Sequence, residues 1–270
     1  MRTKNLDKDT KKDVDNYLNE KPKTSKGRIS LADERGNACA EFKKMYSVSK
    51  FKSKTANQKR IIESIKNPEV IISVASGKPG TGKTYSAIQG ALEEFKSGNY
   101  DKIYLCKSVK TLDSGSEEVG FLKGTLEEKI APFIFSFDFN FTQIIDEEVY
   151  LSAKENKIIE FLPIAYIRGI GIKNSIIIVD EAQNINTSIL RTILSRIGMN
   201  TKIILLGDTQ QKDSDTKNDC GLTFLIKHFQ DIKGIEFINM TKDDQSRSPL
   251  INIIEDKYDE LEDKGILKKK

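Results

Sequence analysis

Short runs of apolar residues alternate along the chain with segments whose apolar residues recur every three or four positions. Mostly apolar runs, such as residues 70–75 and 175–179, are typical of strands that are buried on both faces. Residues 187–197 instead carry isoleucine and leucine at helical spacing, which predicts an amphipathic helix. Since strands and helices alternate, the pattern predicts an α/β fold with a parallel sheet covered by helices on both faces.

The remaining elements are predicted on the same grounds. The expected strands are residues 70–75, 102–106, 158–167, 175–179, 202–206 and 235–238. The expected helices are residues 56–65, 83–97, 125–135, 187–197, 222–229 and 249–261. Between residues 28 and 50 the apolar residues are unevenly spaced and support at most one marginal helix.

Charge divides the chain into three predicted regions: a partly disordered arm at residues 1–50, a compact domain at 51–265 and a basic tail at 266–270. The first 50 residues contain 13 Lys and Arg against 8 Asp and Glu, a net charge of +5, whereas the remainder is close to neutral. Such an arm either contacts the phosphates of a nucleic acid or is a solvated, partly disordered segment. Because the arm carries charges of both signs, the second interpretation is favoured.

Composition excludes several functional classes. The 270 residues contain no run of 18 apolar residues, so we expect no membrane span, and the charged start lacks the apolar segment of a secretory signal. Three widely separated cysteines and a single histidine do not suit a disulfide scaffold or a zinc site of ordinary ligand spacing. We therefore expect a cytoplasmic protein.

A glycine-rich segment follows the first predicted strand and opens the next helix. Its sequence, Gly77-Lys-Pro-Gly-Thr-Gly-Lys-Thr84, fits the P-loop pattern G-x-x-x-x-G-K-[ST]. Glycines let backbone N–H groups surround a phosphate, and the helix N-terminus directs its positive dipole at the anion. Lys83 would reach the β- and γ-phosphates, and Tyr85 would pack or stack on the nucleotide. The residues predicted to bind nucleoside triphosphate here are Gly77, Lys78, Pro79, Gly80, Thr81, Gly82, Lys83, Thr84 and Tyr85.

Two carboxylates follow the most apolar of the predicted strands, as Asp180-Glu181. Ligands of α/β proteins bind at the carboxyl ends of strands, so this pair is expected beside the P-loop. Asp180 and the Thr84 hydroxyl would hold Mg²⁺, and Glu181 would orient or deprotonate the attacking water. Because a small-molecule kinase needs no such base, the pair favours hydrolysis over phosphotransfer.

Another predicted strand ends in Gly207-Asp-Thr-Gln-Gln211. A glutamine at this position could contact the γ-phosphate or the attacking water, since its amide both donates and accepts hydrogen bonds. The same residues could equally form a plain polar turn.

Together these motifs resemble the PhoH family, P-loop ATPases similar to the motor core of superfamily 1 helicases. The resemblance covers about residues 54–262. It rests on the P-loop and on Thr55-x-Asn57-Gln58, Gly120-Phe-Leu-Lys-Gly124, Pro163-Ile-Ala-Tyr-Ile-Arg168-Gly169, Val179-Asp-Glu-Ala-Gln-Asn184, Ser195-Arg196-Ile-Gly198, Gly207-Asp-Thr-Gln-Gln211-Lys-Asp213, Gly221-Leu222 and Arg247-Ser-Pro-Leu250.

The resemblance implies a RecA-like fold with a single motor domain and adds roles to individual residues. It implies that Gln58 reads the adenine edge and that Gln211, rather than its neighbour, senses the γ-phosphate. It also implies that Arg168, Arg196 or Arg247 completes a neighbouring subunit's site, although each could be an ordinary surface or ion-paired arginine. The chain departs from the family where Lys107-Ser108 replaces the usual Arg-Pro, so the ligand of that loop could be held differently.

These predictions converge on Mg²⁺-dependent ATP binding and hydrolysis. An isolated motor domain would lack an arginine supplied in trans, so we expect a homo-oligomer, such as a hexameric ring, with ATP at subunit interfaces. One interpretation is a helicase-like ATPase that acts on RNA or single-stranded DNA. The alternative is an ATP-dependent conformational or assembly switch that acts on a protein partner without nucleic acid.

Overall fold

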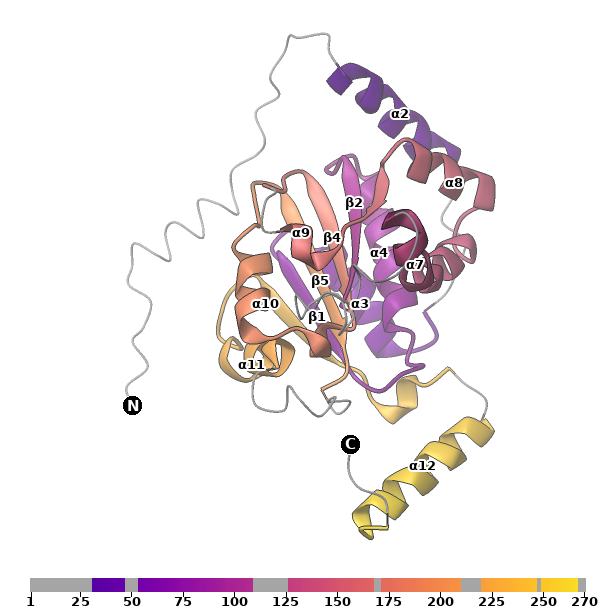
Figure 1. Ribbon diagram of the computed structural model, residues 1–270, viewed down its shortest axis with the longest axis vertical. Coiled ribbons are helices and arrows are strands. Elements are labelled where there is room, and N and C mark those ends of the chain that lie inside the picture. Colours follow the sequence, from indigo (N-terminus) through magenta and orange to yellow (C-terminus); the bar gives the residue numbers. More distant parts are fainter. Residues whose placement is uncertain are drawn as a thin grey trace, which may run out of the picture.

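The computed structural model describes residues 31–46, 53–108, 126–167, 171–209, 220–246 and 249–266. Within these residues six strands form one parallel sheet, in the order β3-β2-β4-β5-β1-β6 (Figure 1). Arg168, Gln211, Arg247, residues 120–124, most of the predicted arm and nearly all of the predicted tail lie outside the described residues.

The bounds of the elements are as follows. The strands are β1 (Ile72–Ser76), β2 (Lys102–Lys107), β3 (Ile159–Phe161), β4 (Ser175–Asp180), β5 (Thr201–Gly207) and β6 (Ile235–Asn239). The helices are α2 (Leu31–Met45), α3 (Ala56–Lys66), α4 (Lys83–Lys96), α7 (Leu126–Thr142), α8 (Glu147–Glu155), α9 (Ile164–Ile167), α10 (Thr187–Leu194), α11 (Gly221–His228) and α12 (Pro249–Asp263). No helix in the described part of the chain has the length and apolar character needed to span a membrane.

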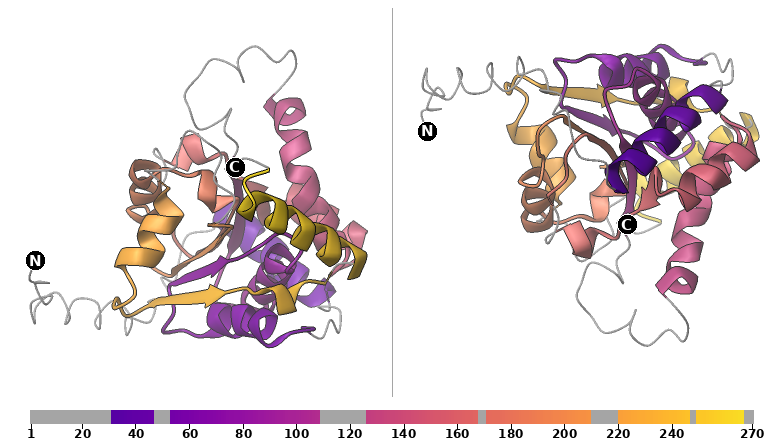
Figure 2. Two further views of the ribbon diagram at one scale, coloured as in Figure 1. Left: turned by 90° about the horizontal axis from the view of Figure 1, so that it is seen from below. Right: turned by 90° about the horizontal axis from the view of Figure 1, so that it is seen from above.

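Alternate residues of the central strands pack into two separate apolar cores. On β4, Ile176 and Ile178 face the core that includes α3, α4 and α7, whereas Ile177 and Val179 face the core beneath α10 and α11. Figure 2 shows these helices on opposite sides of the sheet. One strand, β5, separates the P-loop strand β1 from β4, as in RecA-like folds. The fold class predicted from the sequence is confirmed.

The predicted strand at residues 158–167 is wrong over most of its length. Only Ile159–Phe161 pairs with β2, and residues Ile164–Ile167 form the short helix α9. Proline explains the change, because Pro163 has no N–H to continue the ladder and suits the start of a helix. Its carbonyl instead accepts a hydrogen bond from the Tyr166 N–H at 2.9 Å, in a helical turn.

The N-terminal helix α2 packs on the domain, although residues 28–50 predicted at most a marginal helix within a charged arm. Cys39, Phe42 and Tyr46 are buried in the same core as α4. The Phe42 and Phe95 rings lie 5.8 Å apart, and the Tyr46 hydroxyl donates to the Leu92 carbonyl at 2.7 Å. These three residues recur at helical spacing, so the C-terminal part of α2 and Tyr46 pack against the core.

Replacing Phe42 with Ala is expected to lower the free energy of unfolding by about 3 kcal/mol, because it leaves a cavity against Phe95. Urea denaturation followed by circular dichroism would measure the change. Met45→Ala is the matched control, since Met45 lies on the same helix and is 58% exposed. Equal stability of the two variants would show that α2 contributes nothing to the core.

Candidate nucleotide site

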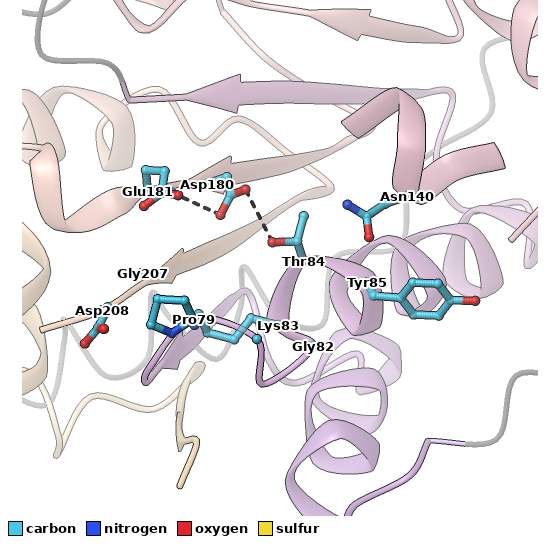
Figure 3. A pocket seen from close by; sticks show the side chains of 11 residues that line it. Pro79, Gly82, Lys83, Thr84, Tyr85, Asn140, Asp180, Glu181, Gly207 and Asp208 are labelled. Carbon is cyan, nitrogen blue, oxygen red and sulfur yellow. Dashed lines mark hydrogen bonds between the residues drawn. The ribbon is translucent and has the colours of Figure 1, made fainter. Parts of the chain in front are cut away.

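A cavity of about 260 Å³ opens at the carboxyl ends of β1, β4 and β5. Its walls come from the P-loop, the first turn of α4, the end of α7 and the two strand tips beyond β4 and β5 (Figure 3). The lining residues are Pro79, Gly80, Gly82, Lys83, Thr84, Tyr85, Asn140, Asp180, Glu181, Gly207 and Asp208. The sequence motifs of three strands therefore meet at one cavity, at the edge of the sheet where α/β ligands bind.

The P-loop is shaped by glycines and by the lysine that follows them. Gly82 has φ +80°, a left-handed conformation in which L side chains are strained, and it directly precedes α4. The Lys83 ammonium donates hydrogen bonds to the carbonyls of Gly77 at 2.6 Å and Lys78 at 2.9 Å. These bonds hold its positive charge over the loop, where the N-terminal dipole of α4 adds to it.

The buried side chain of Gln58 forms a hydrogen bond to the backbone of the P-loop. Its side chain is 1% exposed, and its amide accepts from the Lys54 N–H at 2.8 Å while donating to the Thr81 carbonyl at 3.0 Å. The same amide donates to the Ser246 hydroxyl at 3.3 Å, and the Ser246 N–H donates to the Gly80 carbonyl. In the structure, the amide of Gln58, the residue expected to read adenine, thus bonds to the Lys54 N–H, the Thr81 carbonyl and the Ser246 hydroxyl.

Replacing Gln58 with Met is expected to weaken the binding of ATP and GTP alike, by about tenfold, because buried groups of the P-loop lose their partners. Titration with fluorescent analogues of both nucleotides would measure the two affinities. Gln89→Met is the control, since Gln89 is also buried but bonds Glu93 within α4. A selective loss of ATP binding would show that Gln58 reads the adenine ring.

Thr84 and Asp180 come together as the sequence predicted, from the start of α4 and the tip of β4. The Thr84 hydroxyl donates to Asp180 Oδ2 at 3.3 Å (Figure 3). Burial raises the pKa of the Asp180 carboxyl to about 6, the Glu181 charge adds to the rise, and the ammonium groups of Lys107 and Lys83 oppose it. A desolvated carboxylate beside a hydroxyl, next to a phosphate-binding loop, fits Mg²⁺, which prefers oxygen ligands.

Glu181 leaves β4 with an uncommon backbone conformation. Its φ is +54°, in the left-handed region, and its N–H donates to Asp180 Oδ1 at 3.0 Å. Its carboxylate accepts a hydrogen bond from the Gln183 amide at 2.6 Å. A sharp turn thus sets the side chain of Glu181 at the cavity wall, one residue beyond the proposed metal ligand.

The structure does not bring every predicted residue to this cavity. Tyr85 lines it, and its hydroxyl donates to the Gln143 carbonyl at 3.5 Å. Arg196 lies on an exposed turn beside Ile172 and Ile197, at the amino edge of the sheet, opposite the cavity. Arg196 is therefore not among the residues that line this cavity.

Three residues at or near the cavity were not assigned a role from the sequence. Asn140 lines the cavity from α7, beyond the predicted end of that helix at residue 135. Asp208 lines it from the tip of β5, and Gln183 contacts Glu181 from the turn after β4. The motifs around residues 183 and 208 were visible in the sequence, but nothing local indicated that the Gln183 side chain accepts a hydrogen bond from the Asp208 N–H.

Comparison with known proteins identifies relatives over most of the chain. The profile of the family described as PhoH-like protein matches residues 50–259. A PhoH-like protein of Synechocystis sp. is 31% identical over 211 residues, which are 78% of this chain and 63% of that protein. A PhoH-like protein of Bacillus subtilis is 32% identical over 206 residues, 76% of this chain and 63% of that protein. The chain thus spans less than two thirds of the length of these curated relatives.

Solved structures that superpose on part of this chain include a terminase and a helicase domain. The large terminase of a thermophilic bacteriophage, in complex with ADP, superposes with a TM-score of 0.44 at 14% identity, over 74% of this chain and 49% of that one. The Hef helicase domain of Pyrococcus furiosus gives a TM-score of 0.38 at 15% identity, over 69% of this chain and 38% of that one.

Proposed function

Since this chain belongs to the PhoH-like protein family, we propose that it binds ATP with Mg²⁺ and hydrolyses it. The observation that carries the proposal is the meeting of Lys83, Thr84, Asp180 and Glu181 at one cavity, with Thr84 and Asp180 in hydrogen-bond contact at 3.3 Å. These are the groups that phosphoryl transfer requires: a phosphate cradle, a cation, oxygen ligands for Mg²⁺ and a base for water.

Each group has a distinct part in the proposed reaction. Lys83 and the N-terminus of α4 bind the β- and γ-phosphates and stabilise the charge that develops on them. Mg²⁺, when held by Thr84 and Asp180, supplies further charge neutralisation at the phosphates. Glu181 accepts a proton from water as the water oxygen bonds to the γ-phosphorus, while the bond from that phosphorus to ADP breaks. ADP and inorganic phosphate are the products.

We further propose that hydrolysis is coupled to RNA or single-stranded DNA. The support is the net charge of +5 over residues 1–50, together with the family resemblance to helicase motor cores. ATP turnover should therefore rise in the presence of single-stranded oligonucleotides and fall back as salt is added. If the rate of ATP hydrolysis at low salt were the same with and without polynucleotides, the result would instead favour the ATP-dependent switch that acts on a protein partner.

A homo-oligomer, such as a hexameric ring, is proposed because α12 exposes an apolar stripe. Leu250, Ile253 and Tyr258 are exposed along it, and Figure 1 shows α12 standing apart from the sheet. An isolated helix of about 15 residues is marginal in water, so a helix such as α12 gains stability when a partner covers its exposed apolar side chains. Residues 249–266 carry six acidic and two basic side chains, whereas residues 1–50 have a net charge of +5, so a second copy offers a region of opposite charge to α12.

The double replacement of Leu250 and Ile253 by Ser is expected to shift the protein from an oligomer to a monomer, as measured by light scattering after gel filtration. The reason is the loss of two exposed apolar anchors of α12. Phe135→Ser is the control, since Phe135 is equally exposed on α7. An unchanged oligomer mass in the double variant, or a monomeric wild-type protein, would contradict the role of α12.

A further inference from the structure

One buried amide connects the candidate base Glu181 to the tip of the neighbouring strand β5. Gln183 is 4% exposed and lies in a 3₁₀ turn, Ala182–Asn184, directly after Glu181. Its Nε2 donates to Glu181 Oε2 at 2.6 Å, and its Oε1 accepts from the Asp208 N–H at 3.1 Å. The single side chain therefore contacts both strand tips that line the cavity.

The chemistry of the two partners determines the orientation of this amide. A carboxylate can only accept a hydrogen bond from nitrogen, and a backbone N–H can only donate to oxygen. If the amide were rotated by half a turn, its oxygen would face the Glu181 carboxylate oxygen and its NH₂ group would face the Asp208 N–H, so neither hydrogen bond could form. Glutamine is the neutral side chain that offers a donor and an acceptor at this length, which neither glutamate nor methionine does.

The surroundings of Gln183 keep the amide in place. A Cβ at Gly207 would lie 2.7 Å from Gln183 Oε1, so the last residue of β5 must be glycine for the amide to approach. The Gln183 carbonyl accepts a hydrogen bond from the Cys220 thiol at 3.3 Å, at the start of α11. The backbone and the side chain of Gln183 are thus both held by hydrogen bonds. The fixed Gln183 amide can therefore fix the orientation of the Glu181 carboxylate.

We infer that Gln183 is a positioning residue that orients the Glu181 carboxylate for water activation and couples it to the tip of β5. The inference rests on the proposed ATPase function, because it concerns the base of that reaction. Any displacement of the backbone at Asp208 would move the Gln183 amide and with it the carboxylate, because one side chain bonds to both. Gln183 thus acts through Glu181 rather than on the nucleotide itself.

Two variants separate the two hydrogen bonds of Gln183. Gln183→Met keeps the length and volume but loses both bonds, whereas Gln183→Glu keeps the acceptor for Asp208 N–H and sets a negative charge against Glu181. Both variants should lower kcat for ATP hydrolysis by about 10- to 100-fold, a size of effect typical of removing a residue that orients a functional side chain. The KM for ATP and the affinity for ADP should stay close to those of the wild type, whereas the melting temperature of Gln183→Met should fall, because the buried Asp208 N–H loses its acceptor. Gln89→Met, a buried glutamine bonded within α4, is the matched control.

Single-turnover rates complete the test. In the Glu181→Gln background, Gln183→Met should cause no further loss, because a residue that acts through Glu181 has no effect once the base is absent. Unchanged kcat in both variants, a raised kcat, full activity of Gln183→Glu or an additive loss with Glu181→Gln would overturn the inference. A wild-type protein that hydrolyses no ATP would instead overturn the proposed function, so the two failures are distinct.

Discussion

Replacing Glu181 with Gln is expected to lower the rate of ATP hydrolysis by about 10²- to 10⁴-fold, the usual contribution of a general base. The substitution removes the basic oxygen but preserves the size of the side chain, at a cavity wall where the backbone turn already directs it. The affinity for ATP should change little, since Lys83 and the P-loop still bind the phosphates. Steady-state hydrolysis and nucleotide titration on the same preparations would measure both.

The control for this prediction is Glu155→Gln, which removes the same charge from an exposed position on α8. Hydrolysis by this variant should match the wild type. If Glu181→Gln retained more than about a tenth of wild-type turnover, another group would have to activate the water, since loss of a general base costs at least about 10²-fold.

Replacing Lys83 with Ala is expected to weaken ATP binding by about 10²- to 10³-fold. The ammonium would make charge-assisted bonds to two phosphates, and these are about twice as strong as neutral hydrogen bonds. The Gly77 and Lys78 carbonyls also lose their common donor, so the loop itself loses part of its support. Isothermal calorimetry with a non-hydrolysable ATP analogue and Mg²⁺ would measure the affinity.

Lys66→Ala serves as the control for net charge, because Lys66 pairs with Glu93 on the exposed surface at 2.8 Å. Its affinity for the analogue should equal that of the wild type. Equal binding by Lys83→Ala and Lys66→Ala would show that the glycine-rich segment does not hold the triphosphate as proposed.

Much of the fold follows from local patterns in the sequence. The apolar runs at residues 175–179 and 202–206 correspond to β4 and β5, because strands covered on both faces need apolar residues at successive positions. The P-loop and the Asp180-Glu181 pair were recognisable because their chemistry requires particular residues at short fixed spacing. Their meeting at one cavity was also predictable, since parallel strands bring their carboxyl ends to the same edge.

Local patterns failed where distant segments decide the structure. The apolar side chains of α2 are buried only because Phe95 on the distant helix α4 covers them. A weakly apolar helix becomes stable when such a partner surface covers it. Pro163 outweighed the apolar run around it and ended β3 after three residues.

The sequence by itself therefore determined the fold class, the glycine-rich loop before α4 and the two carboxylates at the end of β4, because each depends on neighbours in the chain. Only the tertiary structure decided that Gln58 holds the P-loop, that Gln183 connects Glu181 to Asp208, and that Arg196 lies at the opposite edge of the sheet. The physical reason is that a hydrogen bond between residues that follow different strands, here the Gln183 side chain and the Asp208 N–H, depends on strand order. In this sheet β4 and β5 are neighbours, and that adjacency brings Gln183 and Asp208 within bonding distance.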